Sequence, residues 1–231
     1  MWYNQIGGKM YKYLLIDLDG TLLDFKMGEK EAFIETLNKC GYKNISDEIC
    51  NEFSKINEYY FNEYAKNNMT RDMFHYKRFN DIFKELDIKY DPMDADKIYV
   101  ESLKYQAQLF PDILDTLDFL SKKYTLYIAS NGINEIQEKR LLKANILSYF
   151  KEVFASEAIG FNKPKKEFFE YIIKKIGDTN LDSYLMIGDR FDTDILGAKN
   201  VCIKSILINR DNNLVNHEIE IKRFDELKKI L

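Results

Sequence analysis

From residue 110 to the C-terminus, extended and helical segments alternate along the chain. Short apolar runs typical of buried strands are separated there by segments whose apolar residues recur three and four positions apart, as on one face of a helix. We expect strands over residues 125–130, 152–155, 184–188 and 205–208, and helices over residues 113–120, 135–142, 167–176, 195–199 and 224–230. This alternation predicts an α/β fold, a Rossmann-like parallel sheet with helices on both faces.

One more strand precedes this alternating region, and a helical block lies between them. Residues 11–18, with the sequence YKYLLIDL, form a short apolar run that ends at Asp19 and Gly20, as expected of a buried strand followed by a turn. Residues 27–108 contain no comparable run, and helical spacing recurs over residues 31–37, 49–64, 73–86 and 95–105. We therefore predict an α/β core formed by residues 10–25 and 109–231, with residues 26–108 inserted as an all-helical cap domain. Residues 1–9 are predicted to be an extension ahead of the fold.

The composition is that of a folded protein with a slight excess of acidic residues. Hydrophobic residues make up 45% of the 231 residues and charged residues 31%, and the formal net charge is −4. That charge does not favour binding to a nucleic acid polymer, so any phosphate must be bound locally. No run approaches the roughly 20 apolar residues that a transmembrane helix needs, and the N-terminus lacks the pattern of a signal peptide. We expect a cytoplasmic protein without a membrane partner, whose three widely spaced cysteines are reduced.

Two aspartates stand at the end of the first predicted strand. Because alternate residues of a strand point to the same face, Asp17 and Asp19 can share one site if the strand geometry continues through both. Two close carboxylates repel each other, and a hard cation such as Mg²⁺ between them relieves the repulsion. Gly20 allows a sharp turn here, and Thr21 adds a hydroxyl group. The simpler alternative is that these acidic residues only terminate the strand.

Further acidic residues follow another predicted strand. Gly188 and Asp189 end the strand over residues 184–188, and Asp192 and Asp194 lie just beyond it. In parallel sheets ligands bind at the carboxyl ends of the strands, so this group adds to the candidate site. Alternatively, Asp192 or Asp194 could cap the helix that is expected to begin near residue 195.

One lysine and one short polar segment complete the candidate site. Lys163 lies in the sequence NKP at residues 162–164, just ahead of a predicted helix, and a cation is needed where three acids surround one phosphate. Ser130, Asn131 and Gly132 follow the second strand and offer hydroxyl, amide and backbone N–H donors that can hold a phosphate. The alternatives are that Ser130 and Asn131 only cap a helix and that Lys163 is a solvated surface charge.

Four motifs therefore occur in one order, each beside a predicted strand end. They are DLDGT at residues 17–21, SNG at 130–132, NKP at 162–164 and GDRFDTD at 188–194. This order resembles the haloacid dehalogenase superfamily over residues 13–208, and the helical insertion resembles that superfamily's first type of cap. Ser130 to Ile133, followed by Gln137, Arg140 and Leu141, is similar to the subgroup of pyrimidine 5'-nucleotidases, in which threonine is frequent at the position of Ser130.

The resemblance implies a role for each of these residues. Asp17 is the expected nucleophile, Asp19 the expected acid-base residue, and Lys163 a third catalytic residue. Mg²⁺ is the expected cofactor, held by the Asp17 carboxylate, the Asp19 backbone carbonyl and Asp189, with Asp194 in support. The phosphoryl oxygens are expected to bind Asp17, Thr21, Ser130, Asn131, Gly132 and Lys163.

The expected activity is Mg²⁺-dependent hydrolysis of small phosphate monoesters through an aspartyl-phosphate intermediate, with a nucleoside 5'-monophosphate as substrate. Phosphoglycolate and sugar phosphates are rival substrates. A phosphomutase would use the same four motifs, whereas a dehalogenase has no evident use for Asp19. A catalytically silent binding protein usually lacks a catalytic residue, and none is missing here. The expected partner is a small phosphorylated metabolite, and we expect a monomer or a homodimer.

Overall fold

The structure of the chain is a computed structural model, which describes residues 11–66, 68–215 and 217–231. The chain divides into two compact units, one formed by residues 11–24 and 109–231 and the other by residues 25–108. The insertion expected over residues 26–108 differs from the second unit by one residue. The predicted extension, residues 1–9, lies outside the described residues.

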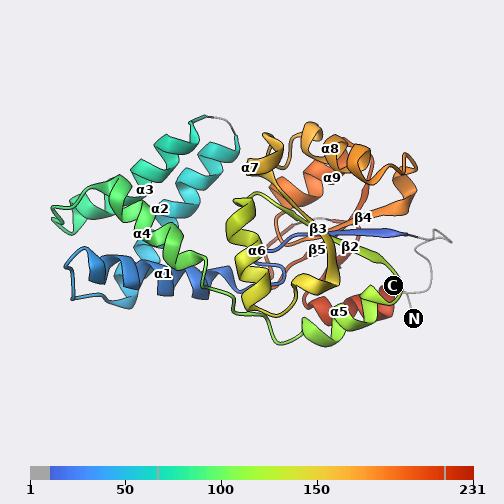
Figure 1. Cartoon of the computed structure of the whole chain (residues 1–231), viewed down its shortest axis with the longest axis horizontal. Coiled ribbons are helices and arrows are strands. Elements are labelled where there is room, and N and C mark those ends of the chain that lie inside the picture. Colours follow the sequence, from blue (N-terminus) through green and yellow to red (C-terminus); the bar gives the residue numbers. More distant parts are fainter. Residues whose placement is uncertain (1–10, 67, 216) are drawn as a thin grey trace. The chain divides into compact units, whose positions relative to one another are not determined.

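A parallel sheet forms the centre of the first unit (Figure 1). Its strands are β1 (Tyr13–Ile16), β2 (Thr125–Ser130), β3 (Phe150–Ala155), β4 (Tyr184–Gly188), β5 (Lys204–Ile208) and β6 (Glu220–Ile221). Among the described residues the six strands have the order β3-β2-β1-β4-β5-β6, and every neighbouring pair is parallel. Ile16 of β1 pairs with Ile128 of β2 on one side and with Ile187 of β4 on the other. The carboxyl ends of these three strands therefore lie side by side, and the predicted α/β fold is confirmed.

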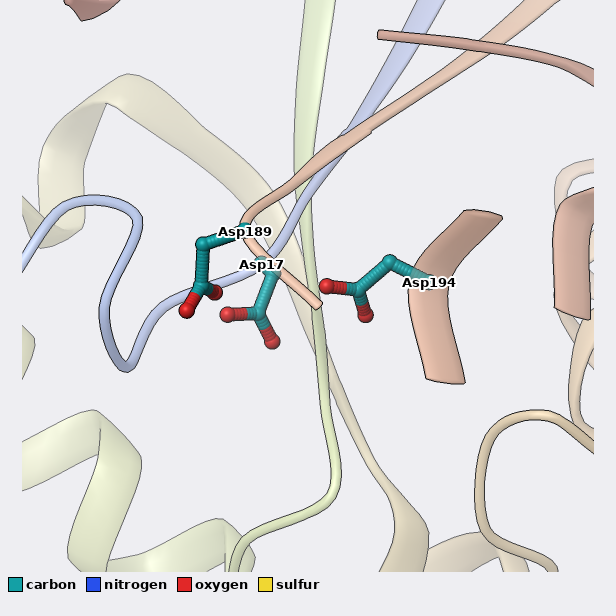
Figure 2. A group of neighbouring side chains, drawn as sticks. All are labelled: Asp17, Asp189 and Asp194. Carbon is teal, nitrogen blue, oxygen red and sulfur yellow. The ribbon is translucent and has the colours of Figure 1, made fainter. Parts of the chain in front are cut away.

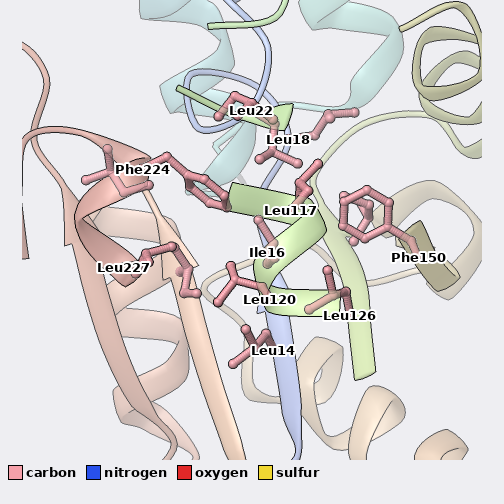
Figure 3. Close-up of a cluster of buried hydrophobic side chains, with 14 of the residues drawn as sticks. Leu14, Ile16, Leu18, Leu22, Leu117, Leu120, Leu126, Phe150, Phe224 and Leu227 are labelled. Carbon is pink, nitrogen blue, oxygen red and sulfur yellow. The ribbon is translucent and has the colours of Figure 1, made fainter. Parts of the chain in front are cut away.

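Helices cover both faces of the sheet because alternate strand residues point to opposite sides. Leu14 and Ile16 pack with Leu117 in one buried cluster (Figure 3) that includes residues of α5 (Leu114–Ser121), α6 (Asn134–Lys143) and α10 (Leu227–Ile230). Leu15 packs with Phe168 in a second cluster that includes residues of α8 (Lys166–Ile176) and α9 (Leu196–Asn200). Each fully buried leucine or phenylalanine contributes roughly 1.5–3 kcal/mol. The two clusters therefore hold the strand ends in fixed positions.

Most elements begin and end within a few residues of their expected bounds, and the differences have local causes. The helix expected from residue 195 begins earlier, as a π-helical turn over Phe191–Ile195 that runs into α9. The helix α7 (Ser156–Ile159) was not predicted because four residues make about one helical turn and show no helical period, and the two-residue strand β6 is too short to show an alternation. Short 3₁₀ turns cover Leu147–Tyr149, Leu181–Ser183 and Phe224–Glu226.

The second unit is all-helical. Its helices are α1 (Phe25–Lys39), α2 (Asp47–Ala65), α3 (Arg71–Glu85) and α4 (Pro92–Leu103). Ser46, Thr70 and Asp91 precede α2, α3 and α4, and the side chain of each accepts a hydrogen bond from a backbone N–H of the first turn. These contacts satisfy donors that have no partner inside the helix, which explains where the three helices begin.

Aromatic side chains and one buried ion pair fill the interior of this helical unit. The rings of Phe33 and Phe53 stack with their centroids 4.0 Å apart, and Phe79 packs against both. The guanidinium of Arg78 is buried and lies 2.6 Å from a carboxylate oxygen of Asp96. Arg78 and Phe79 therefore both lie in the core of the helical unit.

No helix in the part of the chain that the structure describes is both long enough and apolar enough to cross a membrane. Cys40, Cys50 and Cys202 are each free of a disulfide partner. Cys50 is buried in the helical unit, and Cys202 is exposed beyond α9.

Candidate active site

Three carboxylates from separate segments meet at the carboxyl edge of the sheet (Figure 2). Asp17 follows β1, Asp189 follows β4, and Asp194 lies in the π-helical turn before α9. Each offers one oxygen, and the three oxygens all lie within 4.8 Å of one another. The Asp17 backbone N–H donates to Ile187 O at 2.9 Å, which extends the pairing of β1 with β4 by one residue. The structure thus brings together the three acids that the sequence placed at two different strand ends.

Two glycines allow the carboxylates to approach the backbone. A Cβ atom at Gly188 would lie 2.2 Å from an oxygen of Asp194, and one at Gly20 would lie 2.3 Å from an oxygen of Asp189. Gly20 also has a φ of 87°, in the left-handed region that residues with a side chain rarely adopt. Any larger residue at either position would push a carboxylate out of the group.

Lys163 lies inside this group of acids. Its ammonium donates to Asp17 Oδ1, Asp194 Oδ1 and the carbonyl oxygen of Ala129, each at 2.6 Å. These contacts use all three N–H bonds of the ammonium, and Lys163 is 1% exposed. The alternative of a solvated surface lysine is therefore wrong.

The backbone of Lys163 is fixed by Asn131. The Asn131 carboxamide oxygen accepts from the Lys163 backbone N–H at 2.7 Å, and its amide nitrogen donates to the Lys163 carbonyl at 3.0 Å. The sequence predicted that Asn131 would bind phosphate, but this side chain is occupied in joining the loop after β2 to the loop that carries Lys163. Phosphate binding by Asn131 stays a prediction, through its backbone N–H or the second N–H bond of its amide.

Burial and mutual repulsion favour the protonated form of two of these acids. Burial raises the pKa of Asp17 to about 7; Lys163 opposes this effect and Asp194 adds to it. Burial, together with the charges of Asp17 and Asp194, raises the pKa of Asp189 well above its usual range. For Lys163 burial alone would lower the pKa, but the carboxylates of Asp17 and Asp194 outweigh it and raise the pKa. With all three acids ionised, the group would carry more negative charge than the ammonium of Lys163 offsets.

This donor set fits Mg²⁺. All three acids offer oxygen, the ligand atom that Mg²⁺ prefers, and they converge from three segments of chain. When all three acids are ionised, three carboxylates against one ammonium leave two negative charges, which is the charge that one Mg²⁺ would neutralise. Asp194 has a partner on each oxygen, Lys163 on Oδ1 and the Arg190 backbone N–H on Oδ2 at 3.0 Å. Asp17 and Asp189 are therefore the carboxylates best placed to bind the ion directly.

The alternative that Asp192 or Asp194 caps the following helix holds in part for Asp194. The N–H that it accepts, from Arg190, lies at the start of the π-helical turn, so one carboxylate both supports that turn and holds Lys163. Asp192 instead forms an exposed ion pair with Arg190, 2.8 Å between Oδ2 and Nη2.

Asp19 does not point into the same group as Asp17. Its Oδ1 accepts from Arg140 Nη1 at 2.5 Å and its Oδ2 accepts from Gln137 Nε2 at 2.8 Å, both from helix α6. The Asp19 side chain thus lies outside the three-carboxylate group, because regular pairing ends at Asp17 and the chain turns at Gly20. That Asp19 shares one catalytic site with Asp17 stays a prediction. A metal contact of Asp19 through its backbone carbonyl stays a prediction.

The remaining candidate residues surround the acids. Thr21 Oγ1 donates to Asp189 Oδ1 at 3.1 Å. Ser130 Oγ accepts from Gln137 Nε2 at 2.9 Å and from the Gly132 backbone N–H at 3.1 Å. Because both lone pairs of the Ser130 hydroxyl are used, its O–H bond is the group that can donate to a phosphoryl oxygen.

Three contributions to this site were not assigned from the sequence. They are the clamp that Asn131 places on Lys163 and the contacts of Gln137 and Arg140 with Asp19. Gln137 and Arg140 lie three residues apart on α6, a spacing that places both on one face. That spacing was the available signal, and it became informative only once the position of Asp19 was known.

Comparison with known proteins identifies the family of this chain. The sequence profile of haloacid dehalogenase-like hydrolases matches residues 11–201. The chain belongs to the haloacid dehalogenase-like hydrolase family. The predicted superfamily is confirmed, and so is the predicted enzyme class, a phosphoric monoester hydrolase.

Two relatives of this haloacid dehalogenase-like hydrolase match it over 90% or more of its length, and a third over less than half. The HAD-hydrolase YfnB of Bacillus subtilis is 31% identical over 96% of each chain. The crystal structure of YfnB bound to magnesium matches with a TM-score of 0.91 at 30% identity, covering 96% of this chain and 99% of that one. Pyrimidine 5'-nucleotidase PynA of Streptococcus pneumoniae is 33% identical over 90% of this chain and 87% of PynA. A glyceraldehyde 3-phosphate phosphatase of Methanothermobacter thermautotrophicus is 38% identical over 44% of this chain and 45% of its own length.

Proposed function

We propose that this hydrolase uses Mg²⁺ to cleave phosphate monoesters through an aspartyl phosphate formed on Asp17. The observation that carries the proposal is the group of Asp17, Asp189 and Asp194, whose oxygens lie within 4.8 Å, with the Lys163 ammonium 2.6 Å from two of them. Asp17 and Asp189 would hold the ion, with the backbone carbonyl of Asp19 as the resemblance implies. Bound Mg²⁺ would offset the charge of the phosphoryl oxygens and polarise the bond to phosphorus.

The first half of the reaction transfers the phosphoryl group to the protein. A carboxylate oxygen of Asp17 attacks phosphorus, the bond from phosphorus to the ester oxygen breaks, and Asp19 gives its proton to the departing alcohol. In the second half, water attacks phosphorus, its proton passes to Asp19, and the bond from phosphorus to Asp17 breaks to release inorganic phosphate. Lys163 and the Ser130 hydroxyl would donate to the phosphoryl oxygens and stabilise the charge that develops there.

We propose a nucleoside 5'-monophosphate, and a pyrimidine nucleotide first among these, as the substrate. The support is the match with PynA, a pyrimidine 5'-nucleotidase, over 90% of this chain. Glyceraldehyde 3-phosphate is a second candidate, because phosphatases named for it match this chain, including one that is 38% identical over 103 residues. Both substrates are small phosphorylated metabolites, as the sequence predicted.

A panel of phosphate monoesters, assayed with Mg²⁺ and with excess chelator, tests this function. It contains pyrimidine and purine 5'-monophosphates, glyceraldehyde 3-phosphate, phosphoglycolate, sugar phosphates and 4-nitrophenyl phosphate. We expect release of inorganic phosphate with Mg²⁺, the highest kcat/KM for a pyrimidine nucleotide, and loss of turnover in chelator that added Mg²⁺ restores. Full activity in chelator would remove the metal from the proposal, and no turnover of any ester would contradict the function itself.

Mg²⁺ affinity is expected to increase with pH, because protons and the ion compete for the same carboxylates. With the pKa of Asp17 at about 7 and that of Asp189 also raised, the Kd for Mg²⁺ should fall at least about tenfold between pH 6 and pH 8. The raised pKa also stabilises the metal-free fold at low pH, and this stabilisation is lost as the pH rises through about 7. Titrating Mg²⁺ by calorimetry at fixed ionic strength measures the Kd for Mg²⁺ at each pH. A Kd that does not change with pH would contradict it.

A further inference from the structure

Two side chains of helix α6 hold the carboxylate of Asp19. Arg140 Nη1 lies 2.5 Å from Asp19 Oδ1, and Gln137 Nε2 donates to Asp19 Oδ2 at 2.8 Å. Arg140 is 1% exposed and Gln137 is 2% exposed, whereas the Asp19 side chain keeps 27% of its surface exposed. The donors are thus buried behind a carboxylate that itself remains accessible.

The amide of Gln137 is fixed in orientation by its neighbours. Its oxygen accepts from Arg140 Nη1 at 3.0 Å, and its nitrogen donates to Asp19 and to Ser130 Oγ, at 2.8 and 2.9 Å. Both N–H bonds of the amide are used, and the opposite assignment of its oxygen and nitrogen would place two donors against Arg140. A Cβ at Gly132 would lie 2.3 Å from the amide nitrogen, so the space for Gln137 depends on a glycine.

The stability of the fold alone does not explain this buried network. A buried guanidinium carries a desolvation penalty, and an ion pair of this kind is often no more stabilising than apolar side chains of equal volume. What such a network does supply is a carboxylate in one defined position, since each of its oxygens has a donor at a fixed distance.

We propose that Arg140 and Gln137 are positioning residues, which act through Asp19 and hold its carboxylate where it can serve the leaving oxygen. The inference rests on the proposed function, in which Asp19 is the acid-base residue. Gln137 also links Asp19 to the Ser130 hydroxyl, so the acid-base residue and a phosphate-binding donor share one support. Misplacing a reacting group by about 1 Å costs about 100-fold in rate. Replacing Arg140 or Gln137 should therefore lower kcat strongly and change KM little.

The first measurement is the kinetics of Arg140→Met and Arg140→Lys. Methionine keeps much of the apolar length of arginine, and we expect kcat to fall about 10- to 100-fold with KM changed less than about threefold. Lysine can donate one hydrogen bond and should recover part of the lost kcat. Lys139→Met removes a cation from the exposed face of the same helix, where Lys139 pairs with Glu135, and should leave kcat unchanged.

The second measurement separates positioning from a purely structural role. If Arg140 acts through Asp19, Arg140→Met should cause almost no further loss of kcat in an Asp19→Asn background. In the protein with Asp19 intact, the decrease in kcat caused by Arg140→Met should also depend on the substrate. It should be smaller for 4-nitrophenyl phosphate, whose leaving group needs little protonation, than for the fastest alkyl ester of the panel. An equal loss in both backgrounds, or an increase of kcat in Arg140→Met, would overturn the inference.

Two controls keep the outcome interpretable. Should Arg140→Met fail to fold, as judged by its melting temperature, Gln137→Leu removes the second donor and is tested in the same cycle. Inactivity of the wild type on every ester would contradict the proposed function, whereas an active wild type with additive effects would contradict only the role of Arg140 and Gln137.

Discussion

Asp17→Asn is expected to lower phosphatase turnover by at least about 10⁴-fold, as when a catalytic nucleophile is removed. An amide is too weak a nucleophile to take the phosphoryl group, and Asp194, the other carboxylate beside Lys163, already accepts a hydrogen bond on each oxygen. The fold should persist, because asparagine has nearly the same shape and removes one of three carboxylates that repel one another. The metal-free variant should therefore melt within a few degrees of wild type.

Three measurements decide this prediction. Steady-state turnover gives the loss, the melting temperature reports the fold, and intact mass after an acid quench should show a phosphoryl adduct in wild type that Asp17→Asn lacks. Asp118→Asn is the matched control, because Asp118 on α5 lies in an exposed ion pair with Lys122. This variant should keep the wild-type kcat and melting temperature. Asp17 is not the nucleophile if the variant keeps more than a few per cent of wild-type kcat.

Lys163→Met is expected to affect stability and activity together. It leaves Asp17 and Asp194 buried without their cation, and removing one partner of a buried ion pair costs about 3–5 kcal/mol. Turnover should also fall by orders of magnitude, because the phosphoryl oxygens lose a charged donor. Denaturant unfolding without metal measures the first effect, and phosphate release measures the second.

Two further lysine variants test the interpretation. Lys166→Met removes an exposed cation that pairs with Glu170 on α8, and it should change neither quantity. Lys163→Arg keeps the charge, but a planar guanidinium cannot direct three donors to the points that one ammonium reaches, so kcat should still fall. Wild-type stability in Lys163→Met would mean that the three contacts of 2.6 Å contribute nothing to the fold.

The α/β core was predictable because its strands are short, mostly apolar and separated by periodic helices. The strand over residues 125–130 was placed within its exact bounds, since Leu126 to Ala129 are buried and Thr125 and Ser130 end the run. The two-residue strand β6 could not be found, because its pairing with β5 is decided by long-range contacts and leaves no pattern in the sequence.

The site was predictable as a set of residues but not in the direction of each side chain. Asp17, Asp189 and Lys163 lie together because the ends of parallel strands share an edge. The partners of the Asp19 and Asn131 side chains could not be predicted. They lie on segments more than 30 residues away, α6 for Asp19 and the loop of Lys163 for Asn131. Spacing along a strand cannot show which of two neighbouring partners a polar side chain will choose.

The saturated ammonium of Lys163 has a consequence for how the substrate is received. An ammonium has three N–H bonds, and in the resting protein Asp17, Asp194 and Ala129 O take one each. A phosphoryl oxygen can gain one of these bonds only by exchange with a present acceptor. If the exchange is with Asp17, the arriving phosphate takes over the hydrogen bond from Lys163. It thereby frees Asp17 Oδ1, an oxygen of the proposed nucleophile, to attack phosphorus.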